Sequence, residues 1–142
     1  MREFTHNDFS IGLPDRWIDT SILAIAGPPD RGFSPSITIT REKLDFQLKI
    51  EEYAANQLAA LEQELGDNDY EVVEEGTISI NNSPTFARIH TFDVSEDLKA
   101  KQMQIYFVKG FEALTITCTS TEDGFDDHKP LFMDAVKYFK WN

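Results

Sequence analysis

Apolar and polar residues alternate in several short segments of this chain. Successive side chains of a β-strand point to opposite faces, so this alternation is typical of strands with one buried face. It begins over residues 9–13, just before Pro14, and β-branched runs follow over residues 21–26 and 36–42. The pattern therefore predicts three strands before residue 46.

Two segments have helical periodicity instead. In residues 46–65 the apolar side chains form one stripe at helical spacing, and Gly66 follows as the expected helix stop. Residues 125–139 repeat that spacing, with Pro130 expected in the first turn, where its missing N–H is tolerated. The stripe of the first helix consists of Ile50, Tyr53, Ala54, Leu58, Leu61 and Leu65.

Four more strands are expected between the two helices, over residues 70–80, 84–94, 102–109 and 113–120. Short links, including turns at Asn82-Ser83 and at Gly110, favour antiparallel pairing. The order βββ-α-ββββ-α predicts an α+β fold, in which an antiparallel β-sheet of about six to seven strands is flanked by two main helices. Because no linker divides the chain and 142 residues suit one core, we expect a single domain over residues 1–142.

The charge balance excludes several classes of partner. The chain has 25 Asp and Glu against 13 Lys and Arg, a net charge of −12, which argues against binding to nucleic acid or to anionic lipid. It shows no apolar signal segment and no run of about 18 apolar residues, so we expect no membrane insertion. Cys118, the single cysteine, cannot form an internal disulfide, which fits the reducing cytoplasm.

We find no motif for metal binding or catalysis. The histidines, His6, His90 and His128, are far apart and lack metal-ligand spacing. The acidic run over residues 67–71 resembles a calcium loop, but Val72 stands where that loop requires glycine. The sequence contains neither a nucleophile elbow nor a glycine-rich phosphate loop. We therefore expect no enzyme activity, no metal and no cofactor.

Two residues with reactive side chains are expected to be structural. His90 shares a strand face with Arg88, which is typical of a partly solvated position in a sheet. Cys118 shares its parity with Ile116, and we expect it to be a small core side chain.

Polar residues occur where the pattern expects apolar ones. Gln57 lies on the apolar stripe of the first helix, so it should point toward the sheet or a groove, and an internally hydrogen-bonded glutamine is the simpler alternative. Gln104 and the Ser/Thr residues of segment 36–40 lie opposite the expected core face of their strands. That second face is either solvated or a mixed groove that suits an amphipathic or apolar helix.

Five segments spread over nearly the whole chain form a recognisable pattern. They are Phe9-Ser10-Ile11-Gly12-Leu13-Pro14-Asp15-Arg16-Trp17, Ser36-Ile37-Thr38-Ile39-Thr40-Arg41, Tyr53-Ala54-Ala55-Asn56-Gln57-Leu58, Gln104-Ile105-Tyr106-Phe107 and Leu114-Thr115-Ile116-Thr117. Together they resemble the DcrB/PsbP-like group, and the length and the bare start look most like its effector-associated (Eag) chaperone branch.

This resemblance implies a PsbP-like α/β/α sandwich, a homodimer, and a cytoplasmic chaperone of type VI secretion. Such a chaperone binds the hydrophobic N-terminal region of a secreted effector, shields its transmembrane helices and aids its loading onto the VgrG spike. The alternative is a PsbP/DcrB-like accessory or small-ligand-binding protein without catalytic activity, since fold alone does not fix function.

The resemblance also assigns a partner-binding groove. Ala24 is smaller than the branched residue usual at its place. Ile22 and Ala24 match apolar groove residues, whereas Ser36, Thr40, Gln57 and Gln104 match polar residues that hydrogen-bond to the bound helices.

We predict that zinc, calcium and ATP at micromolar concentration leave the melting temperature unchanged, because the sequence offers no ligand set or phosphate loop for them. Thermal unfolding with and without each ligand checks this expectation. A large upward shift with any of the three would contradict it, since tight binding to the native state must raise its stability.

Overall fold

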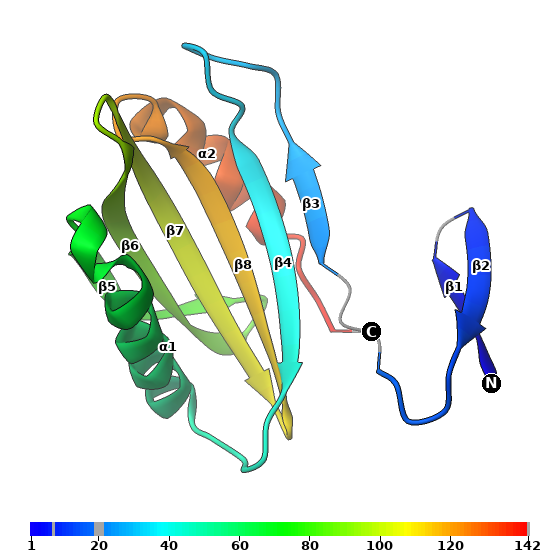
Figure 1. The fold of residues 1–142 in the computed structure, drawn as a ribbon. Helices are drawn as coiled ribbons and strands as arrows, with labels where there is room; N and C mark the ends of the chain where they lie inside the picture. Colours follow the sequence, from blue (N-terminus) through cyan, green and yellow to red (C-terminus); the bar gives the residue numbers. More distant parts are fainter. Residues whose placement is uncertain (7, 19–21, 142) are drawn as a thin grey trace.

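The computed structural model describes residues 1–6, 8–18 and 22–141. Its main element is an antiparallel sheet of six strands in the order β3-β4-β8-β7-β6-β5 (Figure 1). Consecutive strands β5 to β8 pair with their neighbours, and β8 then pairs with β4 from the N-terminal half. The strands are β3 (Leu23–Ala26), β4 (Ser36–Lys43), β5 (Glu71–Ile80), β6 (Ser83–Ser95), β7 (Leu98–Lys109) and β8 (Glu112–Thr121).

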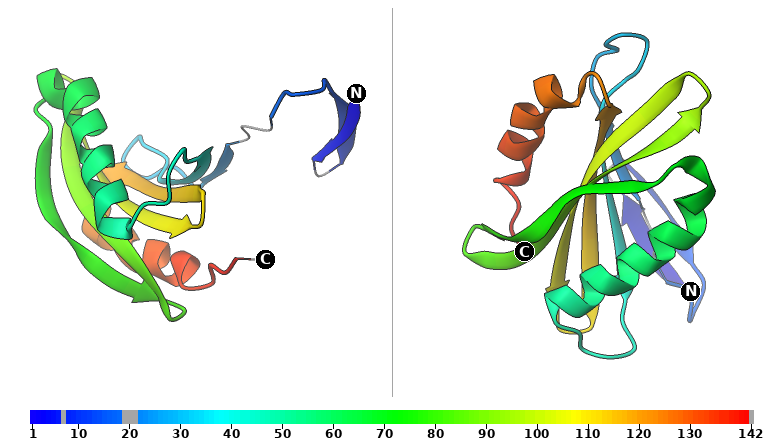
Figure 2. Two further views of the ribbon diagram at one scale, coloured as in Figure 1. Left: turned by 90° about the horizontal axis from the view of Figure 1, so that it is seen from below. Right: turned by 90° about the vertical axis from the view of Figure 1, so that its left-hand side faces the viewer.

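The two helices lie on opposite faces of this sheet. Figure 2 shows α1 (Ile50–Leu65) on one side and α2 (Phe125–Val136) on the other. A sheet with a helix on each face is an α/β/α sandwich, so the predicted α+β fold class is confirmed.

The larger core lies between the sheet and α2. Alternate residues of β7 point into it, namely Met103, Ile105 and Phe107, as their parity predicts. Cys118 belongs to the same core and is completely buried, which confirms its predicted place. The helix contributes Phe125, Phe132 and Val136.

A smaller core lies under α1 on the other face. Tyr53 and Ala54 of the helix pack against Tyr106 and Ala113, and Tyr106 is completely buried. The rings of Tyr53 and Tyr106 meet edge to face, with centroids 5.8 Å apart. These contacts place α1 over the β6 and β7 side of the sheet.

Two tight hairpin turns connect the central strands. Asn81 and Asn82 both have positive φ, 49° and 65°, the geometry of a two-residue turn that asparagine tolerates well. The first turn thus lies one residue before the predicted position at Asn82-Ser83. Gly110, with φ of 60°, forms the predicted turn between β7 and β8.

The N-terminal segment differs from the prediction. Residues 9–13 form strand β2 (Phe9–Leu13), but β2 pairs with β1 (Arg2–His6) in a separate two-stranded sheet. Figure 1 shows this hairpin away from the main sheet. Strand β1 was missed because Phe4 is the only large apolar residue between Arg2 and His6, too few to show an alternation.

The two ends of α1 and the place of Pro130 in α2 also differ from the prediction. Helix α1 begins at Ile50 and not at residue 46, and the carboxylate of Glu52 accepts a hydrogen bond from the Lys49 backbone N–H at 3.0 Å. At its other end the chain continues through a short 3-10 turn, Gly66–Asn68, so Gly66 is helical and Asp69 takes the left-handed conformation at φ 55°. Pro130 lies in the second turn of α2, beyond its predicted place.

Candidate functional site

The sheet face that carries α1 is only partly covered by that helix. Helix α1 packs against β6 and β7, whereas β8, β4 and β3 continue the same face beside it (Figure 1). Thr38, Thr117 and Thr119 on this part are half-buried. We call this surface the open face; its described residues are Ala24, Ser36, Thr38, Thr40, Gln104, Thr117 and Thr119.

Strand register arranges the open face in rows. In one row, Ala24 pairs with Thr38, Thr38 with Thr117, and Thr117 with Gln104. Directly opposed residues in a sheet point to the same side, so these four side chains share one row across four strands, with apolar Ala24 at the edge and three polar residues beside it. Two parallel rows are Ser36, Thr119, Gln102 and His90, and Thr40, Thr115, Tyr106 and Phe86.

The structure brings most of the predicted groove residues together. Ala24, Ser36, Thr40 and Gln104 share the open face. Parity predicted that Ser36, Thr40 and Gln104 lie opposite the core face of their strands, whereas Ala24 was assigned by the family resemblance. Ile22 lies immediately before β3 and is 63% exposed.

Gln57 lies at the side of the open face. It is half-buried on α1, and its amide Nε2 donates to the carboxylate of Glu42 at 3.4 Å. The same carboxylate accepts a 2.6 Å hydrogen bond from the Tyr53 hydroxyl. Gln57 is therefore internally hydrogen-bonded and also lies next to the open face. It combines features of the two alternatives from the sequence, a glutamine bonded within the protein and a glutamine that faces a groove.

Beside the open face, on the part of the sheet that α1 covers, lies a buried cation that the sequence did not reveal. Arg88 on β6 is 2% exposed, and its guanidinium donates to Glu75 Oε2 at 2.9 Å, to the Tyr106 hydroxyl at 3.0 Å and to the Ala54 carbonyl at 3.1 Å. It also lies over the rings of Phe86 and Tyr106. These partners compensate for the cost of removing a charge from water.

His90 is buried beside Arg88, which corrects the prediction of a partly solvated position. Tyr70 covers it, with ring centroids 4.9 Å apart, and its Nε2 lies 2.8 Å from Gln102 Oε1. Burial lowers the pKa of His90, with a smaller contribution from the charge of Arg88, although the bond to Gln102 acts in the opposite direction. The parity of His90 with Arg88 was right, but burial depended on elements distant in sequence.

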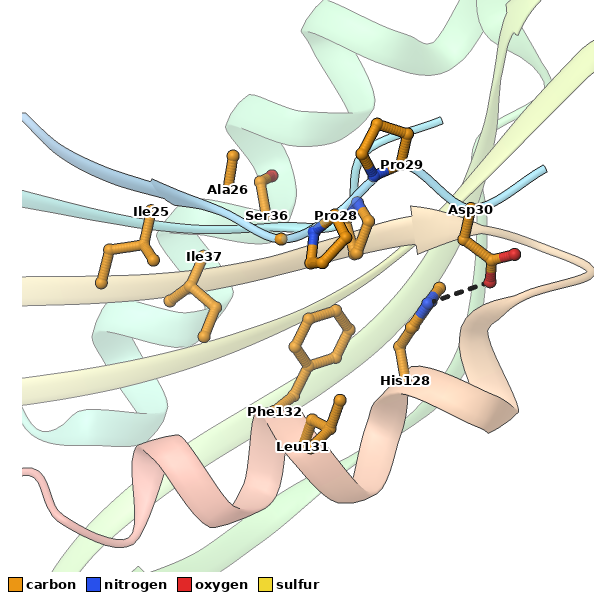
Figure 3. A pocket seen from close by; sticks show the side chains of 12 residues that line it. Ile25, Ala26, Pro28, Pro29, Asp30, Ser36, Ile37, His128, Leu131 and Phe132 are labelled. Atoms are coloured by element: carbon orange, nitrogen blue, oxygen red, sulfur yellow. Dashed lines mark ion pairs between the residues drawn. The ribbon is translucent and has the colours of Figure 1, made fainter. Parts of the chain in front are cut away.

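A cavity lies between α2 and the segment that joins β3 to β4 (Figure 3). This cavity, of about 460 Å³, is mainly apolar, and the ion pair between His128 Nε2 and Asp30 Oδ2, 3.2 Å long, lies at its edge. Its apolar lining includes Ile25, Pro28, Pro35, Ile37, Leu131 and Phe132.

The environment of that cavity does not favour nucleophilic catalysis. Ser120 Oγ lies 2.7 Å from His128 Nδ1, so Ser120, His128 and Asp30 form a chain of hydrogen-bonding groups. However, Ser120 is completely buried, and no substrate carbonyl can reach its oxygen without a rearrangement. Burial likewise raises the pKa of the Cys118 thiol to about 12, which keeps it protonated and a poor nucleophile.

Comparison with known proteins gives the family. Residues 9–137 match the family model of DcrB. The chain belongs to the DcrB family. No relative among curated proteins matches it, and no helix in the described part of the chain is long and apolar enough to cross a membrane.

Two solved structures share the fold of this DcrB-family protein. The protein PA94 from Pseudomonas aeruginosa, of unknown function and described as a putative regulator, has 20% identity and a TM-score of 0.81, covering 100% of this chain and 97% of its own. Cyanobacterial PsbP (CyanoP) from Synechocystis sp. PCC 6803 has 10% identity and a TM-score of 0.56, covering 89% of this chain and 95% of its own. The PsbP-like architecture predicted from sequence is thereby confirmed.

We predict that buried His90 makes the protein sensitive to mild acid. Its pKa is lowered in the folded state from the usual 6.5, so its contribution to stability is complete above that value. The contribution decreases as pH falls below 6.5, because the unfolded chain then binds a proton that the folded protein rejects. Urea unfolding between about pH 7.5 and about pH 5 should show this loss in the wild type and a smaller one in His90→Gln. Equal losses in both proteins would contradict the prediction.

Proposed function

We propose that this DcrB-family protein is a non-catalytic cytoplasmic chaperone of the effector-associated kind. In this proposal the open face binds the hydrophobic N-terminal helices of a type VI secretion effector, shields them from water and aids loading of the effector onto the VgrG spike. The observation that carries the proposal is the open face itself, a half-buried and mixed surface alongside a helix.

The chemistry of the open face suits a membrane helix in water. Such a helix needs its apolar area hidden, and any face of small residues leaves backbone carbonyls accessible to donors. Ala24 and Ile22 offer apolar contact at one edge, whereas Thr38, Thr117 and Gln104 offer hydrogen bonds across the middle. A face of purely apolar residues would lack the second property.

The length of α1 beside the open face also suits a membrane-spanning helix as the guest. Helix α1 has 16 residues and is about 24 Å long, and it lies along one side of the open face. A membrane-spanning segment of about 20 residues is about 30 Å long, so α1 can flank most of it. The guest helix would then lie beside α1 on the uncovered strands.

A homodimer forms part of the proposal. Strand β3 is an edge strand, and Leu23 and Ile25 on it are 49% and 53% exposed. Ile11 on the N-terminal hairpin and Trp17 after it are 59% and 65% exposed. An edge strand beside large exposed apolar side chains favours association with a second copy of the chain.

The cavity beside α2 supports a second candidate function. A volume of about 460 Å³ with an apolar lining falls within the range of small-molecule sites. A PsbP/DcrB-like accessory protein that binds a small apolar ligand would use this cavity and not the open face. The two candidates therefore use opposite sides of the sheet.

If the protein is a homodimer, light scattering should give a particle mass of about twice the 16.2 kDa of the chain. The double variant Ile11→Glu, Trp17→Glu should shift the protein toward the monomer, because it places charges on the proposed contact. The control Leu131→Glu changes an equally exposed side chain on α2 and should leave the mass unchanged. A wild-type mass that stays near 16.2 kDa at all concentrations would exclude the homodimer.

Replacing Gln57 and Gln104 by Leu should weaken capture of the effector's N-terminal fragment by roughly 1–2 kcal/mol for each lost hydrogen bond. Gln57→Leu should leave the melting temperature nearly unchanged. Gln104→Leu should lower it slightly, since the Tyr106 hydroxyl loses its acceptor. Co-purification of the fragment and melting curves measure the two effects separately.

Gln63→Leu is the matched control, because Gln63 is exposed on the same helix. Full capture by the Gln57→Leu, Gln104→Leu double variant would show that these residues do not bind the partner. Unfolding of the double variant would show instead that their role is structural.

A further inference from the structure

We infer that Arg88 and Tyr106 are positioning residues that orient the Gln104 amide so that the open face presents hydrogen-bond donors. The face then selects helices with accessible backbone carbonyl oxygens. This inference rests on the proposed function and assigns two further residues to it, which act on the guest helix through Gln104.

The direction of the hydrogen bonds starts at Arg88, because a guanidinium donates and never accepts. Its Nη1 donates to the Tyr106 hydroxyl oxygen at 3.0 Å, and both side chains are buried. The single hydroxyl hydrogen of Tyr106 therefore points elsewhere. It is donated to Gln104 Oε1 at 2.5 Å.

The amide of Gln104 is oriented by this bond. Its oxygen is directed at Tyr106, so its Nε2 must point the other way, toward β8, where it donates to Thr117 Oγ1 at 3.3 Å. Thr117 accepts this bond, which leaves its own hydroxyl hydrogen to donate. The series of hydrogen bonds that begins at buried Arg88 thus ends on the open face with the N–H groups of Gln104 and the O–H group of Thr117 as donors.

The hydrogen bonds of the neighbouring row, from His90 through Gln102 to Thr119, run in the same direction. His90 Nε2 lies 2.8 Å from Gln102 Oε1, and Gln102 Nε2 donates to Thr119 Oγ1 at 3.0 Å. Both glutamines direct their nitrogen toward β8, whereas Oε1 of Gln102 meets His90 on β6 and Oε1 of Gln104 meets Tyr106 on β7 itself. Two rows therefore bring donors to Thr117 and Thr119, which are two residues apart on one strand.

The spacing of these two threonines fits a helix. Alternate residues of a strand are about 6.8 Å apart, and residues i and i+4 of a helix are about 6 Å apart along its axis. Glycine and serine at every fourth position expose backbone carbonyls on one side of a helix, whereas leucine shields them. A guest with such a stripe can pair with both rows, and an all-leucine helix cannot.

Tyr106→Phe tests the inference because it removes only the hydroxyl between Arg88 and Gln104. The phenyl ring can keep the contacts with Tyr53 and Phe86. Tyr70→Phe is the matched control: the Tyr70 hydroxyl is also buried, but among the described residues it has no hydrogen-bond partner. Melting curves should show both variants folded.

The probes are two synthetic lysine-flanked helices of about 20 apolar residues in mild detergent, one all leucine and one with glycine or serine at every fourth position. Wild type and Tyr70→Phe should prefer the glycine/serine helix by about tenfold, the value of one hydrogen bond. Tyr106→Phe should bind the leucine helix as before and lose most of that preference. An unchanged preference in Tyr106→Phe, or none in the wild type, would overturn the inference and leave the proposed function intact.

A second readout does not need a bound helix. The side-chain amide signals of Gln104 in a ¹H–¹⁵N spectrum, assigned with Gln104→Leu, should shift in Tyr106→Phe and stay in place in Tyr70→Phe. Unchanged Gln104 signals in Tyr106→Phe would overturn the inference. If the wild type binds neither helix, the proposed function fails, and the amide signals alone decide whether Arg88 and Tyr106 orient Gln104.

Discussion

The buried guanidinium of Arg88 is the interaction on which the rest of the α1 side depends. It joins β5 through Glu75, β7 through Tyr106 and helix α1 through the Ala54 carbonyl. Removal of one hydrogen-bond partner from such a buried group typically costs about 1–3 kcal/mol, because a buried donor is then left unsatisfied. The helix is thereby held over β6 and β7, and β8, β4 and β3 extend beyond it as the open face.

The two sides of the sheet differ in polarity. The α2 side is an apolar core, in which Cys118 and Ser120 are buried too deeply for nucleophilic attack. The α1 side has polar rows that lead from buried Arg88 and His90 to threonines on the open face. A side with directed donors and apolar edges suits binding of a helix better than covalent chemistry, which is why the proposal is a non-catalytic chaperone.

Sequence periodicity predicted the parts of the fold that depend on local alternation. Parity alone placed Gln104 and Ser36 opposite the core face, and it placed Cys118 inside the core. Long-range pairing was not predictable in this way: Thr117 joins the open face because β8 lies between β4 and β7. The burial of His90 depended on Tyr70, which is distant in sequence, so its lowered pKa had no signal in the local pattern.

Site-specific photo-crosslinking tests most directly whether the open face holds the hydrophobic N-terminal helix of the effector. A photoreactive residue would replace Thr38, in the middle of the open face, or Leu131, beside the cavity on the other side of the sheet. The proposed chaperone should crosslink to the effector's N-terminal fragment from position 38 and not from position 131. Crosslinking from position 131 alone, in a complex that forms normally, would contradict the proposal and place the binding site in the cavity beside α2.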